Sequence, residues 1–239
     1  RERAVAALGL VVAPSGAHRL VALPEAGPEA HANEARYEAR ISEDGELHLR
    51  GTERYVGAPA AQIRQQFEAP DARARELELR MGRHFPGFTV EALSFTGLDA
   101  HSEEVEYAYE ARVGRYGQQE QDRLVLAVSL FQPELAAAYA ATAGRRSPVR
   151  LMHPWRAHNV VRYRVPERAR IAQLPESRRV TTPWVALEQK LERTPDGFVV
   201  EDTVTFRARR IEVDDYTAFR DACRAIDRAM SRSVVIEWE

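Results

Sequence analysis

Apolar and polar residues alternate along several segments of this chain, which has 239 residues. The clearest run is 104–113, where charged or small residues separate Val105, Tyr107 and Tyr109, and the run 122–131 follows the same rule. A period of two with one wet face is typical of antiparallel strands. We therefore predict a mainly β fold with a few helices, built from antiparallel strands in a β-sandwich-like arrangement.

Two Asp-Gly turns predict β-hairpins. Asp44-Gly45 lies between alternating runs at 35–41 and 47–51, and Asp196-Gly197 lies between runs at 184–192 and 198–209. An Asp-Gly pair flanked by alternating apolar residues is a strong hairpin signal. Within the second hairpin Asp202 interrupts the apolar face, which predicts a bulge or a sheet edge there. Further strands are predicted at 8–12, 18–23, 88–96, 161–165 and 234–236.

Four segments change from a period of two to the spacing of three and four residues that is typical of helices. They begin at Pro59, after Pro70-Asp71, at residue 133 and after Asp214-Asp215, where either aspartate is a candidate N-cap. The segment 133–143 is expected to end before Gly144. The last helix has the clearest apolar stripe, which consists of Phe219, Ala222, Cys223, Ile226, Ala229 and Met230.

Strand-like alternation of apolar and polar residues begins again after an Arg-Arg-Ser-Pro sequence at 145–148, which suggests two β-rich units. We predict a hairpin and linker over 1–25, a first β-rich unit with helices over 26–146, and a second over 147–239 with the terminal helix and strand. The chain opens without an initiator methionine, so we expect a further segment of the parent protein to precede it.

Composition excludes several classes of protein. A net charge of −2 does not favour binding to nucleic acid, and no apolar run reaches the ~20 residues of a membrane span. The single cysteine, Cys223, excludes a disulfide within the chain. Lys190 is the only lysine and Asn33 and Asn159 are the only asparagines, which we interpret as a coding bias.

The sequence offers no recognisable catalytic centre, metal site or cofactor site. It contains neither a phosphate-binding loop nor a dinucleotide fingerprint. Cys223 lies on the apolar stripe of a helix, where burial makes a thiol inert. His153 and His158 are five residues apart around Pro154, and His101 lies with Glu103 and Glu104 in a polar turn; we interpret both groups as solvated loops. The carboxylate pairs lie in turns or helix starts, so none is selected for acid–base chemistry.

One segment is strongly basic. Residues 145–170 contain Glu167 as their only acid, and Trp155 and Tyr163 are interspersed among the arginines. Arginine with aromatic residues can bind an acidic glycan, a phosphate-bearing headgroup or a peptide carboxylate. The simpler alternative is that Arg162 and Arg164 form the wet side of a strand and pair with acids elsewhere. The candidate binding residues are Arg145, Arg146, Arg150, Trp155, Arg156, Arg162, Tyr163 and Arg164.

Several short motifs, in order along the whole chain, resemble the C-terminal β-rich region of bacterial transglutaminase-like proteins that also carry an N-terminal domain of unknown function. The terminal segment 215–220, followed by 225–229, is similar to the closing segment of that family. The other motifs are Leu20-Val21-Ala22-Leu23-Pro24 with Glu29-Ala30 and Asn33, Asp44-Gly45-Glu46-Leu47 with Gly51, and Leu174-Pro175-Glu176.

The resemblance implies that the catalytic Cys-His-Asp set of the family lies upstream of Arg1 and that no catalytic residue falls within this chain. It also implies export to the periplasm or cell envelope and a transglutaminase-like core of the same polypeptide as a partner. The leading hypothesis is therefore a non-catalytic accessory module. The alternatives are a binding module for an acidic glycan, peptidoglycan or partner protein through the basic segment, and an independent hydrolase.

Overall fold

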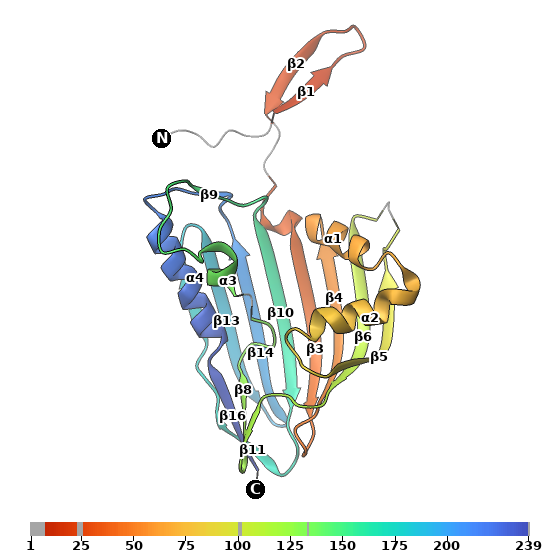
Figure 1. Ribbon diagram of the computed structural model, residues 1–239, viewed down its shortest axis with the longest axis vertical. Coiled ribbons are helices and arrows are strands. Elements are labelled where there is room, and N and C mark those ends of the chain that lie inside the picture. The colour runs from red at the N-terminus through yellow and green to blue at the C-terminus, as the bar shows by residue number, and fades with distance from the viewer. Residues whose placement is uncertain (1–7, 23–25, 100–101, 133, 239) are drawn as a thin grey trace.

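An eight-stranded sheet organises the computed structural model, which describes residues 8–22, 26–99, 102–132 and 134–238 (Figure 1). The strand order is β12-β13-β14-β10-β3-β4-β6-β5. In chain order these strands are β3 (Ala32–Ile41), β4 (Leu47–Val56), β5 (Phe88–Thr96), β6 (Glu104–Val113), β10 (Trp155–Arg164), β12 (Arg178–Thr181), β13 (Val185–Thr194) and β14 (Gly197–Phe206). The prediction of a mainly β fold is confirmed.

Both Asp-Gly hairpins are present. The first joins β3 to β4 and the second joins β13 to β14, each in unbroken antiparallel register. Gly45 at the first turn has φ +79°, a conformation that glycine adopts without strain.

A parallel pairing at the centre of the sheet was not foreseen. Strand β10 lies beside β3, with Ala157 opposite Asn33 and Asn159 opposite Ala35, and all other pairings in the sheet are antiparallel. This pair joins strands from 26–146 to strands from 147–239 in one sheet. The division into two β-rich units remains a prediction, and strands from both ranges belong to one sheet.

Helices cover the inner face of the sheet in two groups (Figure 1). Helix α1 (Ala58–Gln66) lies over β4 and β6, and α2 (Arg73–Met81), which follows the short turn η2 (Pro70–Ala72), packs against β5. Helix α4 (Tyr216–Met230) lies over β12 and β13, and the short helix α3 (Leu135–Tyr139) packs against α4. The predicted stripe of α4 is buried from Phe219 to Met230, because every third or fourth side chain meets the sheet.

A second, four-stranded sheet completes the sandwich-like packing. Its order is β11-β16-β8-β7, formed by β7 (Gln118–Glu120), β8 (Arg123–Ala127), β11 (Ala169–Gln173) and β16 (Ser233–Trp238). Leu126 and Ile236 of this sheet share one apolar core with Tyr163 and Phe198 of the large sheet. The remaining elements are the turn η1 (Pro28–Ala30), the pair β9 (Val149–Arg150) and β15 (Arg210–Ile211), and the hairpin β1 (Leu8–Val12) with β2 (His18–Ala22).

The interpretation of Asp202 was wrong. It lies in the middle of β14, between β13 and β10, with regular register on both sides. The side chain is buried and accepts a hydrogen bond of 2.9 Å from Nε2 of Gln189, which also donates to Ser129 at 3.0 Å. Burial raises the pKa of Asp202, and its hydrogen bonds with Ser129 and Gln189 oppose that rise. A satisfied polar network, and not a bulge, explains this polar residue on an apolar face.

Three smaller expectations also changed. The strand predicted at 122–131 ends at Ala127, and α3 ends at Tyr139 rather than near Gly144. Residue 133, the predicted start of that helix, lies outside the described residues. Asp215 occupies the N-cap position of α4 but makes no side-chain capping hydrogen bond.

Candidate functional site

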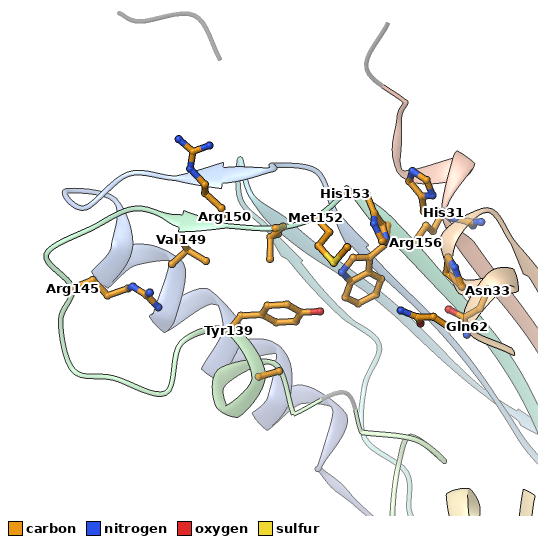
Figure 2. Close-up of a pocket in the computed structure, with 14 residues that line it drawn as sticks. His31, Asn33, Gln62, Tyr139, Arg145, Val149, Arg150, Met152, His153 and Arg156 are labelled. Carbon is orange, nitrogen blue, oxygen red and sulfur yellow. The ribbon is translucent and has the colours of Figure 1, made fainter. Parts of the chain in front are cut away.

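A cavity of about 600 Å³ opens where the N-terminal ends of the central strands β3 and β10 meet η1, α1, α3 and the segment 145–153 (Figure 2). Its lining contains three arginines and two histidines and no acidic side chain. The lining residues with polar or aromatic side chains are His31, Asn33, Gln62, Tyr139, Arg145, Arg150, His153, Trp155 and Arg156. We call this space the basic cavity.

The parallel pairing of β10 with β3 brings two distant parts of the sequence to this point. The backbone N–H of Arg156 donates to the carbonyl of His31 at 3.2 Å. Gly57 lets α1 approach η1, because at φ +69° a β-carbon would collide with the carbonyl oxygen of Ala30. The N–H of Ala58 then donates to Nδ1 of His31 at 3.3 Å. In its neutral form His31 therefore carries its proton on Nε2.

Two imidazoles lie side by side at the rim, as Figure 2 shows. The ring centroids of His31 and His153 are 4.2 Å apart, and the planes are tilted by 45°. Burial lowers the pKa of His153, and both His31 and Arg209 act in the same direction. The three arginines supply the permanent positive charge of the cavity, because a guanidinium stays protonated in proteins.

The three arginines differ in what they contact. Arg145 lies over the ring of Tyr216 at 5.9 Å, and Arg156 is 3.7 Å from Glu34. Within the described part of the chain, neither Arg145 nor Arg150 forms an ion pair. In Figure 2 the guanidinium of Arg150 points away from Tyr139, toward the outside of the cavity. Arg145 and Arg150 thus keep their hydrogen-bond donors available for an anion.

An aromatic wall closes the base of the basic cavity. Trp155 stacks on Phe206 with centroids 4.8 Å apart, and Tyr139 contacts the same ring at 4.8 Å. The buried indole N–H of Trp155 makes no hydrogen bond of good geometry within the described residues, although it interacts with the Tyr139 hydroxyl. Burial raises the pKa of Tyr139, and this interaction opposes the rise.

The structure separates the predicted binding residues into two groups. Arg145, Arg150, Trp155 and Arg156 line the basic cavity, whereas Arg146, next to Arg145, is exposed outside it.

The other group lies further along β10. Arg162 and Arg164 lie on the outer face of the sheet and pair with Glu38 at 3.8 and 3.7 Å. Arg164 also pairs with Asp196 at 3.3 Å, so the simpler interpretation of these two residues is confirmed. Tyr163 was misplaced: it is fully buried in the core, and its hydroxyl is 2.8 Å from that of Tyr116.

Sequence reasoning missed His31, Gln62 and Tyr139, which come from η1, α1 and α3. Their positions give no signal in the sequence. The unforeseen parallel pairing brings η1 and α1 to β10, whereas α3 packs against α4 and its Tyr139 contacts Phe206 of β14. The paired residues that had been considered do not meet. His158 is on the outer face, with Nδ1 2.9 Å from Oγ1 of Thr203, and His101 lies outside the described residues.

Other candidate chemistry within the described residues is limited. Burial raises the pKa of the Cys223 thiol to about 12, as expected of a cysteine in a packed core. Within residues 8–22, 26–99, 102–132 and 134–238, no group of three His, Cys, Asp or Glu side chains is arranged to hold a metal ion. No helix in these ranges is long and apolar enough to span a membrane.

Comparison with known proteins gives a partial match. One solved structure, described as a "putative protease" from Parabacteroides distasonis, is similar at 10% identity and a TM-score of 0.42. That match covers 50% of this chain and 24% of the other chain, and so remote a likeness supports no inference about activity. No curated protein matches the chain. Residues 122–236, slightly less than half of the chain, match a family described as a domain of unknown function with a solved structure (DUF3858).

Proposed function

We propose that this chain is a non-catalytic accessory module of a larger transglutaminase-like protein of the cell envelope, and that it binds an acidic group in the basic cavity. The observation that supports binding is a cavity of about 600 Å³ whose lining combines three arginines with aromatic side chains and lacks any acid. The motif order supports the parent family, and the match of 122–236 to a domain of unknown function is compatible with an accessory role.

The charge arrangement favours an anionic ligand on energetic grounds. Arginines that already pair with an acid have their donors occupied, whereas Arg145 and Arg150 lie at this cavity without an ion pair among the described residues. A charge-assisted hydrogen bond to a carboxylate contributes about 1.5–3 kcal/mol, roughly tenfold or more in affinity. Binding should weaken as salt rises, because these side chains are exposed.

Two adjacent arginines provide a matched test. Arg145 lines the cavity and Arg146 does not, although both are exposed. We expect Arg145→Gln to weaken the binding of peptidoglycan fragments and of an acidic oligosaccharide by about tenfold in calorimetric titration. Arg146→Gln should leave that affinity within about twofold. Equal effects of the two substitutions, or no binding by the wild-type chain, would contradict a role for this cavity.

A second observation favours an additional interaction role. The hairpin β1–β2 exposes Leu8, Leu10, Val12 and Leu20, each more than half accessible, and an isolated two-stranded hairpin gains little stability on its own. We propose that it docks on the transglutaminase-like core. Leu10 and Leu20 are cross-strand partners, so the double substitution to Asp should abolish binding of purified core in a pull-down. Arg145→Gln should leave that binding intact, and we expect the chain alone to catalyse neither hydrolysis nor acyl transfer.

A further inference from the structure

The only two asparagines of the chain line the same cavity. Asn33 and Asn159 both line a second space of about 250 Å³ on the inner face of β3 and β10, below the basic cavity. Asn33 and Trp155 line both spaces, so the two cavities share a wall. We call the second space the asparagine cavity. Its lining includes residues of β3 and β10, and Figure 1 shows these strands between the α1–α2 group and the α3–α4 group.

The amides of the two asparagines are available to a ligand. Neither amide makes a hydrogen bond within the described residues. Asp202, which faces Asn159 across the β10–β14 pair, is engaged by Gln189 instead. Each side-chain amide offers a carbonyl acceptor and an N–H donor side by side, which is the complement of a peptide group.

The floor of the asparagine cavity supplies one more unused donor. Arg80 donates through Nη2 to the hydroxyl of Tyr55 at 2.6 Å and lies 3.6 Å from Glu53. Its Nη1 is buried and has no hydrogen-bond partner among the described residues. A buried guanidinium nitrogen without a partner is costly, and an acceptor from a ligand in this cavity would satisfy it.

The register of the strands fixes how the asparagines are spaced. Asn33 is opposite Ala157 and Asn159 is opposite Ala35, so the two asparagines are offset by two residues along the strand direction. Two residues of extended chain span about 6.6 Å. That distance is also the repeat at which an extended peptide presents peptide groups on the same side.

We propose that the two cavities form one site for the carboxyl-terminal end of an extended peptide. The terminal carboxylate binds Arg145 in the basic cavity. Asn33 and Asn159 pair with peptide groups two residues apart, and Nη1 of Arg80 donates to a carbonyl or side-chain acceptor in the asparagine cavity. This inference rests on the proposed function, because Arg145 holds the acidic group in both. It adds that the preferred ligand is a peptide, which binds more tightly than an acidic sugar.

The test uses the 239-residue chain and three probes. These are fluorescein-labelled tetra-alanine with a free carboxylate, the same peptide with an amidated terminus, and a uronic-acid disaccharide as competitor. We expect the free peptide to bind and amidation to weaken binding by about tenfold, as loss of a charge-assisted contact would. Asn159→Ala should weaken binding of both peptides by about tenfold, whereas Gln118→Ala on the exposed strand β7 should change nothing.

The outcomes separate this inference from the proposed function. If Arg145→Gln weakens binding and Asn159→Ala does not, the peptide inference fails and the acidic site remains. If the disaccharide binds and the peptide does not, the inference also fails. If neither Arg145→Gln nor amidation has an effect, both proposals fail. Should Asn159→Ala not fold, a photoreactive residue within the peptide should cross-link to Met81 or Met230 of the wild-type chain, which line the asparagine cavity; labelling only elsewhere would overturn the inference.

Discussion

Glu53 is the most informative residue to replace, because three tyrosines and an arginine depend on it. It lies on β4 with 4% exposure beneath α2. Tyr55 donates a short hydrogen bond to Oε2, Tyr107 donates to the same oxygen at 2.7 Å, and Tyr109 donates to Oε1 at 3.3 Å. Replacing Glu53 by Leu removes the acceptor for all three hydroxyls and the charge partner of Arg80.

The expected cost follows from these contacts. Hydrogen bonds to a charged group contribute about 1.5–3 kcal/mol each, but adding three of them overestimates the loss. The hydroxyls of Tyr55 and Tyr107 are 3.4 Å apart and can pair with each other in the variant. Removing one partner of a buried ion pair costs about 3–5 kcal/mol, and we expect Glu53→Leu to fall in that range. For a chain of this size, that loss lowers Tm by about 6–20 °C.

Urea unfolding followed by tryptophan fluorescence measures this loss directly, since the chain has three tryptophans. Glu53→Gln keeps the shape and one acceptor oxygen, so it should cost less, about 1–3 kcal/mol. The control is Glu110→Gln, which removes an exposed ion pair with Arg50 and should change the free energy of unfolding by less than about 1 kcal/mol. A loss for Glu53→Leu no larger than that of the control would refute the assignment of Glu53 as the acceptor that holds the cluster together.

Three further predictions concern other parts of the fold. Burial raises the pKa values of Tyr55, Tyr107 and Tyr109, and the nearby charge of Glu53 is the second cause of the rise. The folded state therefore keeps these phenols protonated while the unfolded chain ionises, so their contribution to the free energy of unfolding should be fully present below pH ~10 and fall above it in urea titrations. Asp227→Ala should cost about 1–2 kcal/mol, because its carboxylate accepts from the first two N–H groups of α3 at 2.8 Å each; an unchanged urea midpoint would exclude that role. Cys223 should resist a disulfide reagent at pH 8 in the native protein and react once the chain is unfolded in urea; rapid native labelling would contradict its burial.

The strands that were predicted correctly are those with a local signal in the sequence, either alternating apolar residues or an Asp-Gly turn. The run 104–113 forms β6 because alternate residues from Val105 to Val113 meet the core, and each Asp-Gly turn fixes the register of its hairpin. The parallel pair could not be predicted in this way. Residues 32 and 156 are far apart in the sequence, and alternation specifies which face of a strand is buried but not which strand lies beside it.

The candidate site was only partly predictable for the same reason. The basic segment 145–170 correctly predicted Arg145, Arg150 and Arg156 as residues that line the cavity. It also included Arg162 and Arg164, which lie on the outer face of β10. Those two residues already have acidic partners that come from β3 and the β13–β14 turn. The asparagines were interpreted as a coding bias because their shared cavity exists only when β3 and β10 are adjacent.

Two asparagines on the inner face of the central strands β3 and β10 do not increase the stability of the fold. The asparagine cavity lies between two separate apolar cores, with Met81 belonging to one and Met230 to the other. Polar groups that are partly buried without partners lower stability, and apolar side chains at these positions would join the two cores. Asn33, Asn159 and the free nitrogen of Arg80 therefore carry a cost that packing does not explain. A ligand that pairs with all three offsets that cost when it binds, which is the physical reason for placing recognition here rather than on the outer face, where acids already neutralise the arginines.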